Sequence, residues 1–242
     1  MRCILPVVVL LVTIACPRAA HADRRVQALR VLPVVADADL HEGFPTTPRG
    51  DDQQLLTGYD LEASGSQGAT GRVRALLRFD LGHVPPGAII DSATLTVRLV
   101  SSWDTPETSV VCLLRPVTSP WDETTVTWDT APTLDDPWAW ATVPHAAWGW
   151  YSFDLTRLVQ AWQRGDHANY GVMLLGDETR PNWRGFASRE GTYPAQLVVS
   201  YQPPAPTPSP TLTITPSPSV TPTPSVTPTP GAIVRLPLIF SR

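Results

Sequence analysis

The stretch WDETTVTWDTAP, residues 121–132, decides the fold class of this chain. It places two tryptophans seven residues apart, with an acidic pair and a Thr-Val-Thr run between them. Alternating β-branched and aromatic residues at 125–128 predict a half-buried strand, and the flanking Ser-Pro and Ala-Pro pairs are turn signals. Two rings around a carboxylate suit either a corner of the core or a flat stacking platform for a ligand. The core interpretation is favoured, because a buried indole N–H usually finds a nearby acceptor.

Alternation with a period of two residues recurs on both sides of this stretch. In RVRALLRFD, residues 72–80, Val73 and Leu77 lie on one face and the arginines on the other. Residues 92–100 alternate in the same way. Further strands are predicted at residues 110–117, 151–154, 171–175 and 195–201. Strands at this spacing, separated by turn signals, predict an all-β sandwich.

One short helix is predicted among the strands. Apolar residues in DLTRLVQAW, residues 154–162, recur at helical spacing. Asp154 can cap the first turn, and Gly165 can end the helix. A lone helix of this length is expected to cover an open end of the sandwich core.

The first 22 residues predict a secretory signal peptide. A positive start is followed by an apolar run and by Ala-His-Ala before Asp23. The alternative is a lipoprotein signal in which Cys16 is lipidated. Cleavage before Asp23 leaves Cys112 as the single cysteine, so no internal disulfide is expected, and its apolar neighbours predict a buried thiol. The predicted location is secreted or extracellular.

Two further zones follow the globular part of the chain. Residues 203–231 are Pro, Thr and Ser repeats, a composition typical of an extended, disordered linker. Residues 232–242, AIVRLPLIFSR, form a short apolar tail that cannot span a bilayer. The tail is similar to short tails that follow such linkers in exported proteins, and it predicts retention at the cell surface; a frayed apolar end is the alternative. No transmembrane span is predicted.

Charge argues against two classes of partner. The chain has no lysine, and all 22 acids lie in residues 23–201 together with 14 arginines, so this part carries a net charge of about −8. Nucleic acids and anionic membranes favour basic surfaces. Neither is therefore expected as a partner.

The motifs and their order resemble the DNRLRE domain, also described as carbohydrate-binding module family 96. The matching segments are LLRFDL (76–81), PPGAIIDSATLTVRL (85–99), WDETTVTW (121–128), DLTRLVQAWQRGDHANYGVMLL (154–175) and FASREGTYPAQLVVSY (186–201). The resemblance covers residues 31–201 and implies a jelly-roll-like antiparallel β-sandwich. It also implies a non-catalytic module, some relatives of which bind acidic polysaccharides such as alginate.

The resemblance also separates framework positions from ligand contacts. The namesake string of the family is absent, and FASRE stands in the corresponding place. Matching framework positions include Trp121, Trp128, Trp162, Asn169 and Gly171. These residues are not expected to contact a ligand.

No catalytic motif is present in the sequence. The His-Glu-x-x-His, Gly-x-Ser-x-Gly and phosphate-loop patterns are missing. The histidines that follow the predicted leader are expected to be solvated loop residues: His41, His83, His145 and His167. A polysaccharide-cleaving enzyme would need two carboxylates about 5–10 Å apart, and neither acidic pair, Asp122-Glu123 or Asp135-Asp136, reveals its spacing in three dimensions. We expect no enzymatic activity.

Aromatic residues provide the best material for binding a polysaccharide or cell-wall glycan. PWAWATVPHAAWGWY, residues 137–151, contains two Trp-x-Trp pairs, of which Trp138 and Trp148 are predicted to be the more exposed. Flat rings stack on sugars, and arginine pairs with an acidic ligand. The alternative is a structural or adhesive surface domain in which the rings cap the core. The candidate ligand-binding residues are Trp138, Trp140, Trp148, Trp150, Trp183, Arg72, Arg74 and Arg184.

A structural Ca²⁺ is the one cofactor that the sequence suggests. Asp37 and Asp39 lie near the start of the globular zone and Glu190 near its end, where they can meet in space. Calcium takes carboxylate and backbone oxygens as ligands. The domain is expected to be a monomer.

Overall fold

The computed structural model of the chain describes residues 27–61, 70–104 and 108–204. The predicted leader, nearly all of the linker and the apolar tail lie outside the described residues. No helix within these ranges has the length and hydropathy of a membrane-crossing segment.

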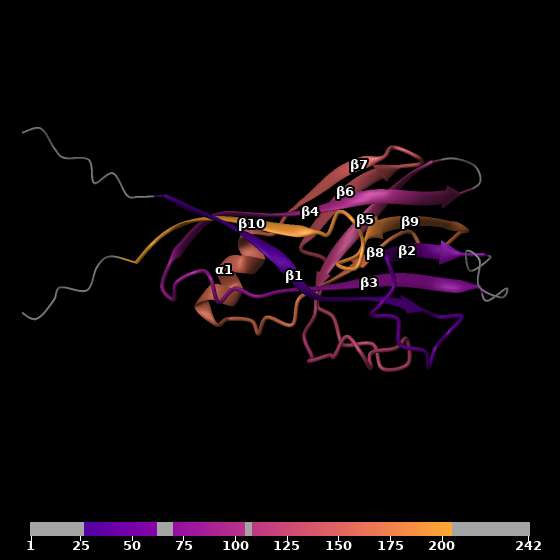
Figure 1. Ribbon diagram of the computed structural model, residues 1–242, viewed down its shortest axis with the longest axis horizontal. Coiled ribbons are helices and arrows are strands. Elements are labelled where there is room, and N and C mark those ends of the chain that lie inside the picture. Colours follow the sequence, from indigo (N-terminus) through magenta and orange to yellow (C-terminus); the bar gives the residue numbers. More distant parts are fainter. Residues whose placement is uncertain (1–26, 62–69, 105–107, 205–242) are drawn as a thin grey trace, which may run out of the picture. The chain divides into compact units, whose positions relative to one another are not determined.

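The described residues form an all-β domain with one helix, α1 (Thr156–Arg164), as Figure 1 shows. The strands are β1 (Ala28–His41), β2 (Gln54–Asp60), β3 (Gly71–Phe79), β4 (Ile89–Asp104), β5 (Ser109–Pro116), β6 (Ala139–Pro144), β7 (Gly149–Asp154), β8 (Val172–Leu175), β9 (Asn182–Ala187) and β10 (Gln196–Gln202).

The described strand pairs are antiparallel, and two long strands make the corners of the sandwich. The order is β1-β10-β4-β9-β2-β3-β8-β5-β6, with β7 on β4 and β1 also on β3. β1 pairs with β10 through Pro33 and with β3 from Val34 onward, where the register shifts. β4 changes partner in the same way on one edge, from β10 to β9, with a shift after Leu99, and its other edge pairs with β7. Strands that switch partners at bulges are the usual corners of packed sheets, and the predicted jelly-roll-like sandwich is confirmed.

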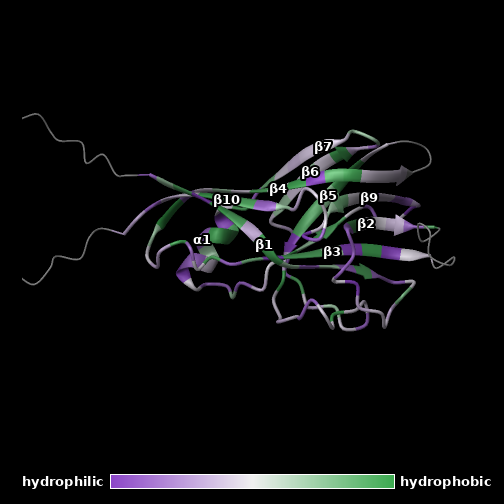
Figure 2. Ribbon diagram, viewed as in Figure 1, coloured by the Kyte–Doolittle hydropathy of each residue, from purple (hydrophilic) through white to green (hydrophobic). Residues whose placement is uncertain are grey.

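The core is lined by alternate residues of the strands, as the sequence predicts for β3 and β4 (Figure 2). Ala75, Leu77 and Phe79 of β3 and Leu95 of β4 are buried in it. Arg72, Arg74 and Arg78 of β3 lie on the opposite face of that strand, where they are half-buried. That outward face of β3 carries Arg72 and Arg74, two of the predicted ligand-binding residues.

Helix α1 covers one end of this core, as expected. Leu158, Val159 and Trp162 are buried against it, and Gly165 ends the helix with a left-handed φ of 79°. The Asp154 carboxylate accepts the backbone N–H of Thr156 at 2.9 Å, so it stabilises the first turn although Leu155 occupies the cap position.

The strand predicted at residues 125–128 is wrong. These residues belong to a loop, residues 117–134, whose ends meet in a bridge between Val117 and Leu134. The Asp122 carboxylate accepts the N–H of Thr124 at 2.9 Å, and the Asp122 carbonyl accepts the N–H of Val126 at 2.8 Å. Asp and Thr side chains that bond to nearby backbone compete with a strand ladder, and here the local bonds prevail.

Two buried side chains test the predictions for single residues. Cys112 is buried in β5, as predicted, and burial raises the pKa of its thiol to about 11. His41 was expected in a solvated loop but is buried at the end of β1. Its Nδ1 accepts the N–H of Gly43 at 3.0 Å and its Nε2 lies 3.8 Å from the Asp60 carboxylate, so it belongs to the framework.

Candidate functional site

The loop of residues 117–134 covers the arginine face of β3. Trp121 is buried, and its indole N–H donates to the Tyr170 carbonyl at 2.8 Å. The Arg78 guanidinium lies 5.1 Å from the Trp121 ring centre. The guanidinium groups of Arg72 and Arg74 lie 5.0 and 4.6 Å from the ring centre of Trp128. The two tryptophans of the opening motif therefore pack as framework on a row of arginines.

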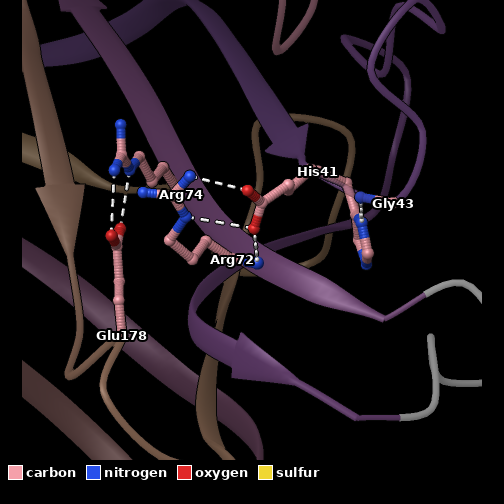
Figure 3. A network of polar contacts seen from close by, with 6 residues as sticks. His41, Gly43, Arg72, Arg74 and Glu178 are labelled. Carbon is pink, nitrogen blue, oxygen red and sulfur yellow. Dashed lines mark hydrogen bonds and ion pairs between the residues drawn. The ribbon is translucent and has the colours of Figure 1, made fainter.

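Arg72 and Arg74 also have carboxylate partners (Figure 3). Arg72 donates to both oxygens of Glu42, at 2.6 and 3.0 Å, and Arg74 donates to both oxygens of Glu178, at 2.6 and 2.8 Å. Hydrogen bonding by Arg72 lowers the pKa of Glu42 to about 2. An acidic ligand would have to compete with an internal carboxylate at either predicted arginine.

Arg184 is placed inside the protein, contrary to its prediction as a ligand contact. It is fully buried, and its guanidinium donates to the backbone carbonyls of Val143 at 3.1 Å and Thr108 at 2.6 Å. Trp183, beside it in β9, is half-buried. β-strand alternation turns Arg184 toward the interior, where it satisfies carbonyl groups between strands.

The four tryptophans of residues 137–151 differ in exposure. Trp140, Trp148 and Trp150 are 69%, 57% and 46% exposed. Trp138, expected among the most exposed, is half-buried against the main core, with the His167 ring 5.4 Å away edge-on. Its backbone N–H donates to the Leu114 carbonyl at 3.0 Å, which draws this position against β5.

Sequence reasoning missed a second aromatic cluster, on the outward face of β4 and β7. Arg98 of β4 pairs in register with Trp150 of β7, and Tyr193 comes from the loop before β10. The Arg98 guanidinium lies 4.0 Å from the Tyr193 ring centre and 5.9 Å from that of Trp150. We call these three residues the Arg98 site. The signal in the sequence was the outward position of Arg98 within its alternating strand.

Arg98 differs from the β3 arginines in having no internal counter-ion. Within the described part of the chain, no carboxylate lies in ion-pair distance of Arg98. Both rings beside it are about half exposed, at 46% and 45%. The guanidinium is therefore free to meet a charge from outside.

Three carboxylates converge elsewhere, in what we call the acidic cluster: Asp37 of β1, Glu123 of the 117–134 loop and Glu190 of the loop after β9. One oxygen from each lies within 4.8 Å of the others. Two of them, Asp37 and Glu190, are brought together as predicted. Asp39 is not in the cluster: its carboxylate accepts the N–H of Leu56 at 2.9 Å and pairs with Arg49 at 3.3 Å.

Glu123 was missed because its motif was assigned to the framework alone. Its carboxylate accepts the backbone N–H of Asp37 at 2.8 Å and the guanidinium of Arg189 at 2.8 Å. The Arg189 guanidinium also reaches Glu190 at 3.0 Å. The acidic cluster thus joins β1, the 117–134 loop and the segment that leads to Tyr193.

Asp37 is the member of the acidic cluster that has an unsatisfied buried oxygen. One of its oxygens, Oδ2, accepts the backbone N–H of Arg189 at 2.7 Å, but the other, Oδ1, is buried without a hydrogen-bond partner. Burial raises the pKa of Asp37 to about 7, and the negative charges of Glu190 and Glu123 add to the effect. Three carboxylates and one guanidinium leave about two negative charges unbalanced when all are ionised. A divalent cation that prefers oxygen ligands fits this arrangement.

The fold and these two surfaces define a β-sandwich with an exposed aromatic face and an acidic cluster that could hold a metal ion. The sequence profile of carbohydrate-binding module family 96 matches residues 30–201. This match spans most of the chain, and the chain belongs to that family, which confirms the resemblance seen in its motifs. No curated protein matches the chain.

Proposed function

We propose that the domain binds an acidic polysaccharide, without catalysis, at the Arg98 site. The observation that carries this proposal is the position of Arg98, an outward guanidinium between two half-exposed rings with no carboxylate partner in the described residues. A guanidinium binds a carboxylate in two parallel hydrogen bonds, and aromatic faces pack on the apolar faces of sugars. A sugar that carries a carboxylate satisfies both groups together.

The test is equilibrium binding of the purified protein to alginate, to pectate and to a neutral polymer such as cellulose. We expect binding to at least one acidic polymer, weaker at high salt because exposed charges are screened. Trp150→Ala should reduce it at least tenfold. Trp103→Ala is the matched control, since Trp103 is 37% exposed on the same strand as Arg98 but belongs to neither cluster.

A domain that binds none of these polymers would favour the alternative, a structural or adhesive surface domain. Equal losses in the Trp150 and Trp103 variants would place the binding surface elsewhere.

We also propose that the acidic cluster holds a structural Ca²⁺. Asp37, Glu123 and Glu190 would supply carboxylate oxygens, and the ion would compensate the buried oxygen of Asp37 that has no partner. The role of the ion is structural: its positive charge compensates the three carboxylates. Its expected effect is to stabilise the contact between β1 and the two loops that carry Glu123 and Glu190.

Thermal unfolding with Ca²⁺ or with chelator tests this second proposal. At pH 7 we expect the melting temperature to rise by several degrees with Ca²⁺, because a ligand that binds only the folded state stabilises it. Asp37→Asn should abolish that rise. An equal response in Asp37→Asn and the parent protein would exclude the acidic cluster as the site.

The pH dependence without metal has a defined sign. The pKa of Asp37 is raised from 3.8 to about 7 by burial, so the folded state holds this proton more tightly than the unfolded state. That contribution to stability is complete below pH 4 and disappears as the pH rises to about 7. Asp39 behaves likewise, with a pKa raised to about 7 by burial. In chelator, Asp37→Asn should therefore lose less stability than the parent between pH 4 and pH 7.

We propose in addition that the domain is exported and held at the cell surface by residues 232–242. The supporting features are the predicted leader, the Pro-Thr linker and the apolar tail. Fractionation of cells that express the chain with and without residues 232–242 is the test. Release of the shortened chain into the medium is the expected result, and unchanged retention would contradict the role of the tail.

A further inference from the structure

A groove lies between strand β6 and helix α1. It measures about 250 Å³ and is lined by Trp138, Ala139, Trp140, Asp154, Arg157 and Leu158. Pockets for drug-sized ligands usually have about 300–1,000 Å³. The groove is therefore of a size for a small group such as one sugar ring.

The groove carries the same chemistry as the Arg98 site. Trp140 is 69% exposed, and the Arg157 guanidinium lies 5.5 Å from the ring centre of Trp138. Within the described residues, Arg157 has no carboxylate in ion-pair distance. A ring surface and a free guanidinium are thus present a second time.

Asp154 adds a hydrogen-bond acceptor to the groove. Its Oδ1 accepts the N–H and the hydroxyl of Thr156 at 2.9 and 2.6 Å, which lowers its pKa and keeps it ionised. Its Oδ2 has no hydrogen-bond partner in the described part of the chain. A sugar hydroxyl can donate to that oxygen.

Strand β7 connects the groove with the Arg98 site. Trp150, Ser152 and Asp154 are all exposed and alternate along the strand, so they share its outward face. Trp150 belongs to the Arg98 site and Asp154 lines the groove. Four residues of strand span about 13 Å, a distance that an extended polysaccharide covers with a few sugars.

We infer that the groove is a second subsite and that one polysaccharide chain occupies both subsites along β7. The inference rests on the proposed function of the Arg98 site. The ligand of the two subsites is an acidic polysaccharide, and its internal sugars rather than its ends are bound. Arg98 and Arg157 offer it one free guanidinium near each end of strand β7. Binding at the first subsite raises the local concentration of the chain at the second, so longer chains should bind more tightly.

Calorimetric titration of the full chain with alginate oligosaccharides of two to eight sugars tests this inference. We expect eight sugars to bind at least tenfold more tightly than two. Trp140→Ala and Arg157→Ala should each remove most of that gain and change the affinity for two sugars no more than about twofold. Trp103→Ala and Arg30→Ala are matched controls, as Arg30 is exposed and bonds only its neighbour's carbonyl in the described structure.

The outcomes separate the inference from the proposed function. Retention of the full gain in both groove variants, with binding still lost in Trp150→Ala, would overturn the second subsite alone. Equal affinity for all lengths in the parent protein would overturn it too. Absence of binding to any oligosaccharide or to the polymer would overturn the Arg98 site and the groove together. Unchanged melting temperatures of the variants exclude unfolding as the cause of a loss.

Discussion

Two clusters of arginine and aromatic side chains lie on this domain, and they differ in what surrounds the arginine. On β3, Arg72 and Arg74 pack on Trp128, and each forms two hydrogen bonds to a glutamate. On β4, Arg98 lies between Trp150 and Tyr193 with no carboxylate among the described residues. The side-chain types are alike, but the β3 cluster is internally complete and the Arg98 site is not.

The difference shows how a structural cluster can be told from a binding surface. A guanidinium that already holds a carboxylate gains little from a second one, because the ligand must displace the first. A partly exposed guanidinium with no internal carboxylate loses only water when a ligand carboxylate binds it. The acidic cluster connects the two regions, since Glu123 lies in the loop that covers β3 and Glu190 lies three residues before Tyr193.

The largest expected effect is a loss of stability on the arginine face of β3, which the 117–134 loop covers. Trp121→Ala removes a buried ring that packs beneath Arg78 and donates to the Tyr170 carbonyl. We expect a loss of about 3 kcal/mol in the free energy of unfolding, measured by urea denaturation, with polysaccharide affinity unchanged wherever the variant is folded. A variant of normal stability would show that the 117–134 loop is not part of the framework.

At the Arg98 site, Arg98→Ala should weaken polysaccharide binding without changing the stability of the domain. Loss of a charge-assisted pair costs about 1.5–3 kcal/mol, which corresponds to at least a tenfold weaker affinity. The melting temperature should stay within about 2 °C, because Arg98 has no ion pair in the described structure to lose. Titration and thermal unfolding of one preparation provide both values, and a large fall in melting temperature would make Arg98 structural.

Arg74→Ala should lower the stability of the domain and leave its affinity for the polysaccharide unchanged. This effect should be smaller than that of Arg98→Ala on binding. Its partly buried pair with Glu178 and its contact with Trp128 predict a loss of about 1 kcal/mol in unfolding free energy. Affinity for the acidic polymer should be the same as that of the parent. A tenfold weaker affinity at normal stability would instead return the β3 arginines to the binding surface.

The smallest expected change comes from Arg98→Lys. Lysine keeps the charge but cannot form two parallel hydrogen bonds or stack flat between rings. We expect roughly threefold weaker binding and a steeper dependence on salt, measured by titration at two ionic strengths. Affinity equal to that of Arg98→Ala would show that geometry, and not charge, governs the site.

Local pattern predicted much of the fold. Alternation identified β3 and most of β4, β5 and β10, and helical spacing with Gly165 identified α1 and its end. The same pattern wrongly predicted a strand at residues 125–128, because hydrogen bonds to Asp122 hold this β-prone run in a loop. Strands β1, β2, β6 and β9 were not predicted, and in β2 and β9 the glycines Gly58 and Gly185 interrupt the side-chain pattern.

The sequence alone determined the sandwich, the helix, the exposure of Trp148 and the buried thiol, because these depend on the residue pattern within one short segment. The tertiary structure decided which arginines are neutralised and which carboxylates meet. Asp37, Glu123 and Glu190 come from three distant segments, and the partners of Arg72, Arg74 and Arg98 depend on how loops cross the strands. Charge compensation is a property of neighbours in space, so a single strand pattern cannot contain it.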